Sequence, residues 1–219
     1  MAKKKFKFTF STSEIKQLTI AALAIAFAFA MILFRREIFT AFAERQFIQI
    51  LIYISLSLLV VGLAFILHEL GHKFVAQKKN LWAEFRMWPM GLLLAIVTSL
   101  FGFVFAAPGA VMILPAKKSK RGFGFARVPM KDMGQIGAAG PIVNIILAVI
   151  FSIAAVLSQF IVAQINIWRV AAQINIWLAI FNLIPFGMLD GFKIFRWNKL
   201  IWGGLMGLSA IMFILVILM

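Results

Sequence analysis

The sequence contains no cysteine and only two histidines, and just seven of its 219 residues are acidic. The absence of cysteine excludes a disulfide framework and every metal site with thiolate ligands. A transition-metal site in this chain must therefore be built from histidine and carboxylate side chains, and the sequence offers few of either.

Charged residues of both signs are scarce as well. They make up 13% of the chain, whereas hydrophobic residues make up 63% and the mean hydropathy is +1.02. A soluble domain has about 45–50% apolar residues, so a soluble fold has no means of hiding this much apolar surface. Long apolar runs separated by short charged clusters favour an all-α polytopic membrane protein. We expect five to six transmembrane helices in a single membrane-embedded domain over residues 1–219.

The formal net charge of +15 would suggest a nucleic-acid partner in a soluble protein. Here Lys and Arg gather at the ends of the apolar runs, where they hold those ends on the cytoplasmic side and contact anionic headgroups. We therefore expect the lipid bilayer, and not a nucleic acid, to be the partner of this positive charge.

The candidate membrane spans cover roughly residues 16–34, 47–77, 133–161, 168–187 and 199–219. The apolar stretch 90–115 differs from them, because glycines and prolines interrupt it and its second half favours a strand. We predict a re-entrant or hairpin/strand segment there, with a full span as the alternative.

The distribution of basic residues supports this prediction. If the N-terminus is cytoplasmic and the stretch 90–115 enters and leaves on one side, nearly all Lys and Arg lie on the cytoplasmic side, as the positive-inside rule requires. The exceptions are Arg35, Arg36, Arg45 and Arg169. A full span would instead place the basic loop after residue 116 outside.

The motif His68-Glu69-Leu70-Gly71-His72 lies late in the second apolar run and contains both histidines of the chain. Two histidines four positions apart share one face of a helix, so both imidazoles reach a single ion, and the intervening glutamate lies beside it as general base. Ionisable groups at such depth are costly unless they are paired or liganded. The motif predicts a zinc site with His68 and His72 as ligands and Glu69 as catalytic base. The alternative is a pair of interfacial histidines, with Glu69 paired to Lys73.

A catalytic zinc ion needs a third protein ligand and an open position for water. Since no other His or Cys exists, the third ligand must be a carboxylate, and Asp190 is the candidate on the same side of the membrane as His68. Pro185, Gly187 and Gly191 break the helix around it, which lets an acid turn inward. The alternative is that Asp190 merely caps a helix.

These residues together resemble the site-2 protease family of intramembrane zinc metalloproteases. The resemblance rests on HELGH at 68–72, GPIVN at 140–144, and NLIP at 182–185 followed by LDG at 189–191, in the family's order. It implies a catalytic core within about 47–191, with zinc bound by His68, His72 and Asp190 and water activated by Glu69. The family often has a second proline before the aspartate, where this chain has Phe186-Gly187-Met188.

The resemblance also implies a reaction, and the distribution of basic residues predicts a location. The expected activity is that of a zinc metalloendopeptidase, hydrolysing peptide bonds in or near the transmembrane segments of membrane-protein substrates during regulated intramembrane proteolysis. We expect the active site to lie toward the cytoplasmic side.

The candidate substrate-binding residues are Asn144, Asn182, Gly109, Ala110, Val111 and Met112. The two asparagines either hydrogen-bond across helices or polarise the scissile carbonyl and hold the substrate backbone. The segment 109–112, bracketed by prolines, is predicted to be an edge strand. An unwound substrate would add to this strand by β-pairing, because the peptide bonds of a helix are shielded from attack.

Two functions of other classes stay open. A membrane transporter or permease also uses broken helices and midplane ionisable residues, but it predicts several acids along a path, and this chain has few. A non-catalytic scaffold that binds membrane proteins would be expected to have lost Glu69, which is present. The sequence indicates neither the natural substrate nor the oligomeric state.

Overall fold

The computed structural model describes residues 8–105, 107–115, 128–158, 161–162, 165–187 and 189–219. The basic clusters expected on the cytoplasmic side at residues 3–7 and 117–127 lie outside the described residues, as does Met188.

Helices make up most of the described chain, as predicted. The elements in chain order are α1 (Thr12–Leu33), α2 (Arg35–Ala43), α3 (Phe47–Ser57), the π-helical turn η1 (Leu58–Gly62), α4 (Leu63–Lys78), β1 (Leu81–Met87), α5 (Pro89–Leu100), β2 (Gly109–Pro115), α6 (Met130–Leu157), β3 (Ile161–Val162), β4 (Ile165–Asn166), α7 (Ile167–Leu183), α8 (Asp190–Trp197) and α9 (Lys199–Leu218).

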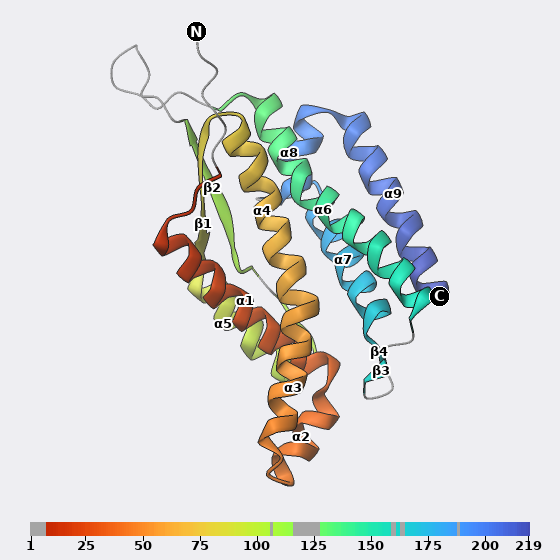
Figure 1. Ribbon diagram of the computed structural model, residues 1–219. Coiled ribbons are helices and arrows are strands. Elements are labelled where there is room, and N and C mark those ends of the chain that lie inside the picture. Colours follow the sequence, from red (N-terminus) through yellow and green to blue (C-terminus); the bar gives the residue numbers. More distant parts are fainter. Residues whose placement is uncertain (1–7, 106, 116–127, 159–160, 163–164, 188) are drawn as a thin grey trace.

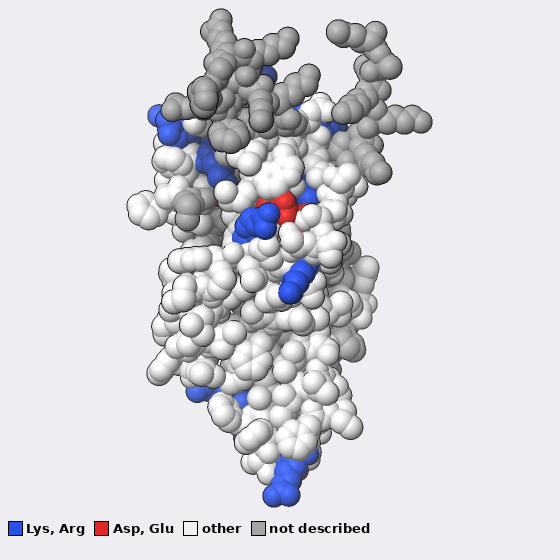
Figure 2. All heavy atoms as spheres, turned by 90° about the vertical axis from the view of Figure 1, so that its left-hand side faces the viewer, with Lys and Arg blue, Asp and Glu red and all other residues white. Residues whose placement is uncertain are grey.

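Four helical stretches among the described residues are long and apolar enough to cross a membrane: Thr12–Leu33, Phe47–Lys78, Met130–Leu157 and Lys199–Leu218. They coincide with four of the predicted spans, with ends shifted by a few residues. Helices α5 and α7 are apolar but shorter, with 12 and 17 residues. On the face shown in Figure 2, charged groups lie over the upper half and near the lower end, and an uncharged region lies between them.

The stretch 90–115 is divided between a helix and a strand. Helix α5 occupies its first part, and β2 pairs antiparallel with β1, from Leu81 opposite Pro115 to Met87 opposite Gly109. The strand predicted in the second half of the stretch is therefore present. Strand β1, which precedes the stretch, was not predicted.

The pairing register fixes which backbone groups face outward. In an antiparallel pair, residues alternate between those bonded to the partner strand and those whose N–H and C=O groups point away from it. The backbone groups of Ala83, Phe85 and Met87 bind side chains outside the sheet. Their partners Ile113, Val111 and Gly109 therefore turn their backbone groups to the free edge of β2.

Helix α6 is the centre of the bundle, because it packs against α4, α7 and α8 (Figure 1). A glycine permits the close approach to α4: a Cβ at Gly71 would lie 3.1 Å from the carbonyl oxygen of Ala139. This packing brings the HELGH helix and the start of α8 to the same side of α6.

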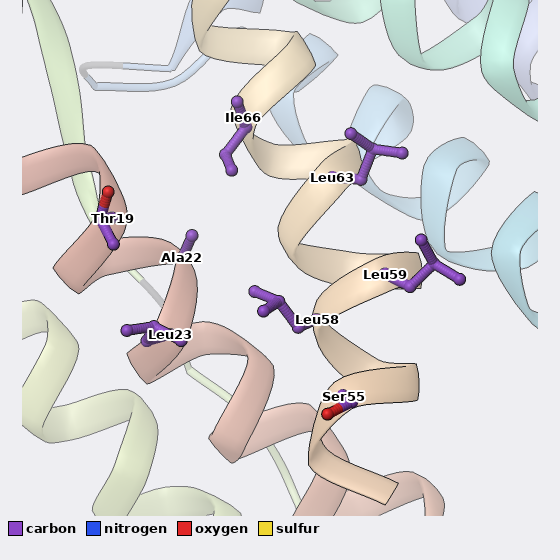
Figure 3. A pocket seen from close by; sticks show the side chains of 8 residues that line it. All are labelled: Thr19, Ala22, Leu23, Ser55, Leu58, Leu59, Leu63 and Ile66. Carbon is purple, nitrogen blue, oxygen red and sulfur yellow. The ribbon is translucent and has the colours of Figure 1, made fainter. Parts of the chain in front are cut away.

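The second apolar run is interrupted by η1, whose π-helical turn separates α3 from α4. An apolar groove of about 400 Å³ opens between α1 and this run. Its lining residues are Thr19, Ala22, Leu23, Ser55, Leu58, Leu59, Leu63 and Ile66 (Figure 3). Neither histidine and no acid lines this groove, so it is separate from the predicted metal site.

Candidate metal site

The three predicted zinc ligands meet in the interior of the protein. The Nε2 atoms of His68 and His72 are 3.0 Å apart, and Oδ2 of Asp190 is 3.3 Å from the first and 2.9 Å from the second. Their exposed fractions are 6%, 6% and 5%. Donors held about 2.0–2.1 Å from a tetrahedral zinc ion are separated by about 3.3 Å, so the observed spacing fits such an ion.

Hydrogen bonds orient both imidazoles toward this point. Nδ1 of His68 donates to Oδ1 of Asn144, and Nδ1 of His72 donates to the carbonyl oxygen of Ile136 at 2.7 Å. Because oxygen atoms accept at both positions, the protons lie on Nδ1 and both Nε2 lone pairs stay available for a metal. Metal-binding histidines in proteins are held in the same way.

A glycine leaves room for an ion beside the two rings. A Cβ added at Gly140 on α6 would lie 2.5 Å from Nε2 of His72 and 2.6 Å from Nε2 of His68. Every other residue type carries that carbon, so only glycine leaves both nitrogens unobstructed. The donor set, its burial and this space together fit zinc.

The predicted catalytic base, Glu69, follows His68 directly in α4. Glu69 is 8% exposed, and its Oε2 is buried with no hydrogen-bond partner among the described residues. The alternative pairing of Glu69 with Lys73 is wrong, because Lys73 binds Glu14 instead. A buried carboxylate oxygen without a partner is costly unless a water or another ligand completes it, so this atom is free to bind a reacting water.

Comparison with known proteins agrees with this geometry. A family model described as Peptidase family M50 matches residues 56–164 and 158–204. The chain belongs to peptidase family M50, the site-2 protease family. A protein of Methanocaldococcus jannaschii named "Putative zinc metalloprotease" is 37% identical over 169 residues, which are 76% of this chain and 81% of that protein. No solved structure matches the chain.

This M50 peptidase is thus a membrane zinc metalloprotease. Family membership favours the metallopeptidase over the transporter and the scaffold considered above.

Asp190 reaches the site because the chain turns back sharply after α7. A Cβ at Gly191 would lie 2.0 Å from the carbonyl oxygen of Leu183, so only glycine allows α8 to start this close to the end of α7. The side chain of Asp190 makes no capping hydrogen bond, and the helix-cap alternative is wrong. Its second oxygen, Oδ1, accepts from Nζ of Lys193 at 2.8 Å. Sequence reasoning missed Lys193, although its spacing of three from Asp190 on a helix was a usable signal.

The two candidate asparagines occupy different environments. Asn144 is fully buried, and besides His68 it binds Asn175, whose Oδ1 accepts from Nδ2 of Asn144 at 2.9 Å. Asn182 donates to the carbonyl oxygen of Leu178 at 2.9 Å, one turn earlier on its own helix. The amide of Asn144 is therefore engaged by the protein on both sides. Sequence reasoning missed Asn175.

The predicted edge strand lies next to the base. Strand β2 contacts α4, and the backbone of Val111 interacts with the Glu69 carboxylate. Among the described residues, no third strand pairs with β2. The metal site therefore has a free strand edge at its side.

Proposed function

We propose that this M50 peptidase is an intramembrane endopeptidase that cleaves peptide bonds in or near the transmembrane segments of membrane-protein substrates, as in regulated intramembrane proteolysis. The observation that carries the proposal is the burial of His68 and His72 within a helical stretch, Phe47–Lys78, that is apolar enough to cross a membrane. Asp190, at the start of α8, is buried against them. A substrate segment in the bilayer reaches such a site without leaving the membrane.

The proposed chemistry assigns one role to each residue. His68, His72 and Asp190 would hold the zinc ion, which when bound would supply Lewis acidity toward the scissile carbonyl and toward a water. Glu69 accepts a proton from the attacking water and passes it to the departing amine. Asn144 hydrogen-bonds across helices, which is one of its two predicted roles, and in doing so orients His68. Its contact with substrate stays a prediction.

The substrate, in this proposal, binds as a strand. The outward-facing backbone groups of β2 belong to Gly109, Val111 and Ile113, whereas Ala110 and Met112 bond to β1. An unwound substrate segment pairing with this edge lies beside Glu69 with its peptide bonds exposed to attack. Side chains at 110 and 112 flank the bound segment without bonding to its backbone. For Asn182 we keep the contact with substrate as a prediction.

We further propose the predicted topology. The N-terminus is cytoplasmic, the active site lies toward the cytoplasmic side, and α5 and α7 complete a membrane-embedded unit of five to six helical elements within one domain. Of the four basic residues expected outside, Arg35, Arg36 and Arg45 lie around α2. In Figure 2 most charged groups lie in the upper half of the face shown, and fewer lie near its lower end.

Cleavage of a membrane-spanning reporter tests the proposal. Zinc-loaded protein in liposomes is incubated with a single-span reporter, and mass spectrometry locates the cut. Wild type is expected to cut within or near the span, whereas Glu69→Gln retains zinc and loses cleavage by a factor of at least about 10². Cleavage confined to water-soluble peptides, or full activity in Glu69→Gln, would contradict the proposal.

The strand proposal has its own pair of variants. Ile113→Pro removes an N–H that faces the outer edge of β2, and Ile113→Ala shortens the same side chain while keeping that N–H. We expect the proline variant to raise KM for the reporter and the alanine variant to leave KM near the wild-type value. Equal KM values in the two variants would show that the substrate does not pair with β2.

A further inference from the structure

Side chains close the outer edge of β1. The N–H of Phe85 donates to Oε1 of Glu14 at 3.0 Å, and the N–H of Met87 donates to Oε1 of Gln17 at 3.0 Å. Nζ of Lys73 donates to the carbonyl oxygen of Ala83 at 2.9 Å. These are the backbone groups that point away from β2, and the start of α1 takes the place of a neighbouring strand there. Exposed strand edges attract other strands, so this edge is protected.

One buried ion pair joins this edge to the metal-binding helix. Nζ of Lys73 lies 2.8 Å from Oε1 and 2.6 Å from Oε2 of Glu14, and the two residues are 2% and 1% exposed. Lys73 follows the ligand His72 directly in α4. Burying two charges is favourable only when their geometry and remaining hydrogen bonds are good, and here each partner also binds a backbone group of β1. The pair therefore links α1, α4 and β1.

Further contacts hold the same segment in place. Ser11 and Ser13 donate to Oε1 of Glu84 on β1 at 2.7 and 2.9 Å. The hydrogen bond from Ser11 is the largest cause that lowers the pKa of Glu84, and the bond from Ser13 adds to it. Together they keep this pKa below its ordinary value although burial raises it. The start of α1 is thus bonded to the sheet along its length.

We propose that Glu14, Gln17 and Lys73 are positioning residues for proteolysis: they close β1 and lock the sheet to α4, so that an unwound substrate is held on β2 beside Glu69. The inference rests on the proposed strand-addition function. It assigns the α1 terminus a part in the reaction, although none of its residues touches the metal ligands.

The polarity of the hydrogen bonds distinguishes this role from that of a simple ion pair. Glu14 accepts from an N–H and Lys73 donates to a C=O. The swapped variant Glu14→Lys/Lys73→Glu keeps opposite charges but places a donor against a donor and an acceptor against an acceptor. An ion pair that only joins α1 to α4 would tolerate the swap, whereas an edge closure would not.

A distance measurement tests the positioning without any cleavage. Because the chain has no cysteine, nitroxide labels attach only at two introduced thiols, Lys16→Cys on α1 and Met112→Cys on β2, which are both exposed sites. Pulsed electron resonance should give one narrow distance in the zinc-loaded parent and a broad distribution in Glu14→Leu and Lys73→Met, which each remove a hydrogen-bonding group of the β1 edge. The matched control is Lys79→Met, which removes another ion pair of the α4 end, that with Asp132, without touching β1.

Cleavage of the single-span reporter is the second readout. A misplacement of about 1 Å far from the chemistry can cost about 10²-fold, so we expect kcat/KM to fall about that much in Glu14→Leu and Lys73→Met with zinc content unchanged. Lys79→Met should stay within twofold of wild type. If Lys73→Met or Glu14→Leu fails to fold, Glu14→Gln decides the question. It keeps an acceptor for Phe85, so edge closure predicts a narrow distance and activity near that of the parent, whereas a simple ion pair predicts the loss of both.

The proposal is overturned if Glu14→Leu keeps the narrow distance and activity within twofold of the control, if Glu14→Gln loses both, or if the charge swap keeps both. If the unmutated parent cleaves no reporter, the proposed function alone is contradicted. The distance measurement would still report on the edge closure.

Discussion

Gly140→Ala adds one carbon at the point where the two imidazoles meet. That carbon would lie 2.5 Å from Nε2 of His72 and 2.6 Å from Nε2 of His68, whereas carbon and nitrogen atoms in ordinary contact are about 3.5 Å apart. Each nitrogen must therefore move by several tenths of an ångström or more. Metal–ligand distances tolerate changes of only about 0.2 Å.

The expected loss of zinc affinity is at least about 100-fold, equivalent to about 2.7 kcal/mol. Gly204→Ala is the matched control, because a Cβ at Gly204 on α9 meets nothing within 4 Å. In a helix this substitution is ordinarily neutral or stabilises by up to about 1 kcal/mol.

The assay is competition of the purified protein with a chromophoric zinc chelator, with circular dichroism to establish that helix content is unchanged. Gly204→Ala should bind zinc as wild type does. Binding by Gly140→Ala within twofold of wild type would refute the placement of the ion between the two rings.

Two further predictions concern the surroundings of the site. Asn144→Ala removes the acceptor of His68 and should lower zinc affinity by about 10–100-fold. Asn182→Ala should not, because among the described residues the Asn182 amide binds the carbonyl oxygen of Leu178 on its own helix. Equal chelator competition in the two variants would show that Asn144 does not orient His68 for zinc. Ser13→Ala removes one hydrogen bond that lowers the pKa of Glu84, for which Ser11 is the largest cause. A carboxyl whose pKa is depressed in the folded protein adds stability above its unfolded pKa of 4.5 and loses that stability as the pH falls. Ser13→Ala should therefore have a lower melting temperature than wild type at neutral pH, and the difference should shrink in acid. A difference that is independent of pH would contradict this.

The convergence of His68, His72 and Asp190 was predictable because its signals are local or scarce. The spacing of four between His68 and His72 is a property of one helix, and the shortage of other ligands left Asp190 as the candidate. Helix breakers around Asp190 indicated a turn, and Gly191 proved to be the residue that permits it.

The surrounding contacts were not predictable, because they depend on how distant elements pack. Asn175 meets Asn144 only once α7 lies against α6. Glu14 precedes the first predicted span and Lys73 follows the motif, and nothing within either segment indicates that they form a buried pair 59 positions apart. Strand β1 was not predicted for the same reason. Its seven residues mix charged and apolar side chains, and its pairing with β2 and its hydrogen bonds to the start of α1 stabilise it.

X-ray absorption at the zinc edge tests the central claim most directly. For zinc-loaded wild type we predict two imidazole nitrogens at about 2.0–2.1 Å and carboxylate or water oxygens completing four ligands. Asp190→Asn should alter the oxygen shell while both nitrogens remain. A spectrum with fewer than two imidazoles, or one that is identical in Asp190→Asn, would contradict a zinc ion held by His68, His72 and Asp190.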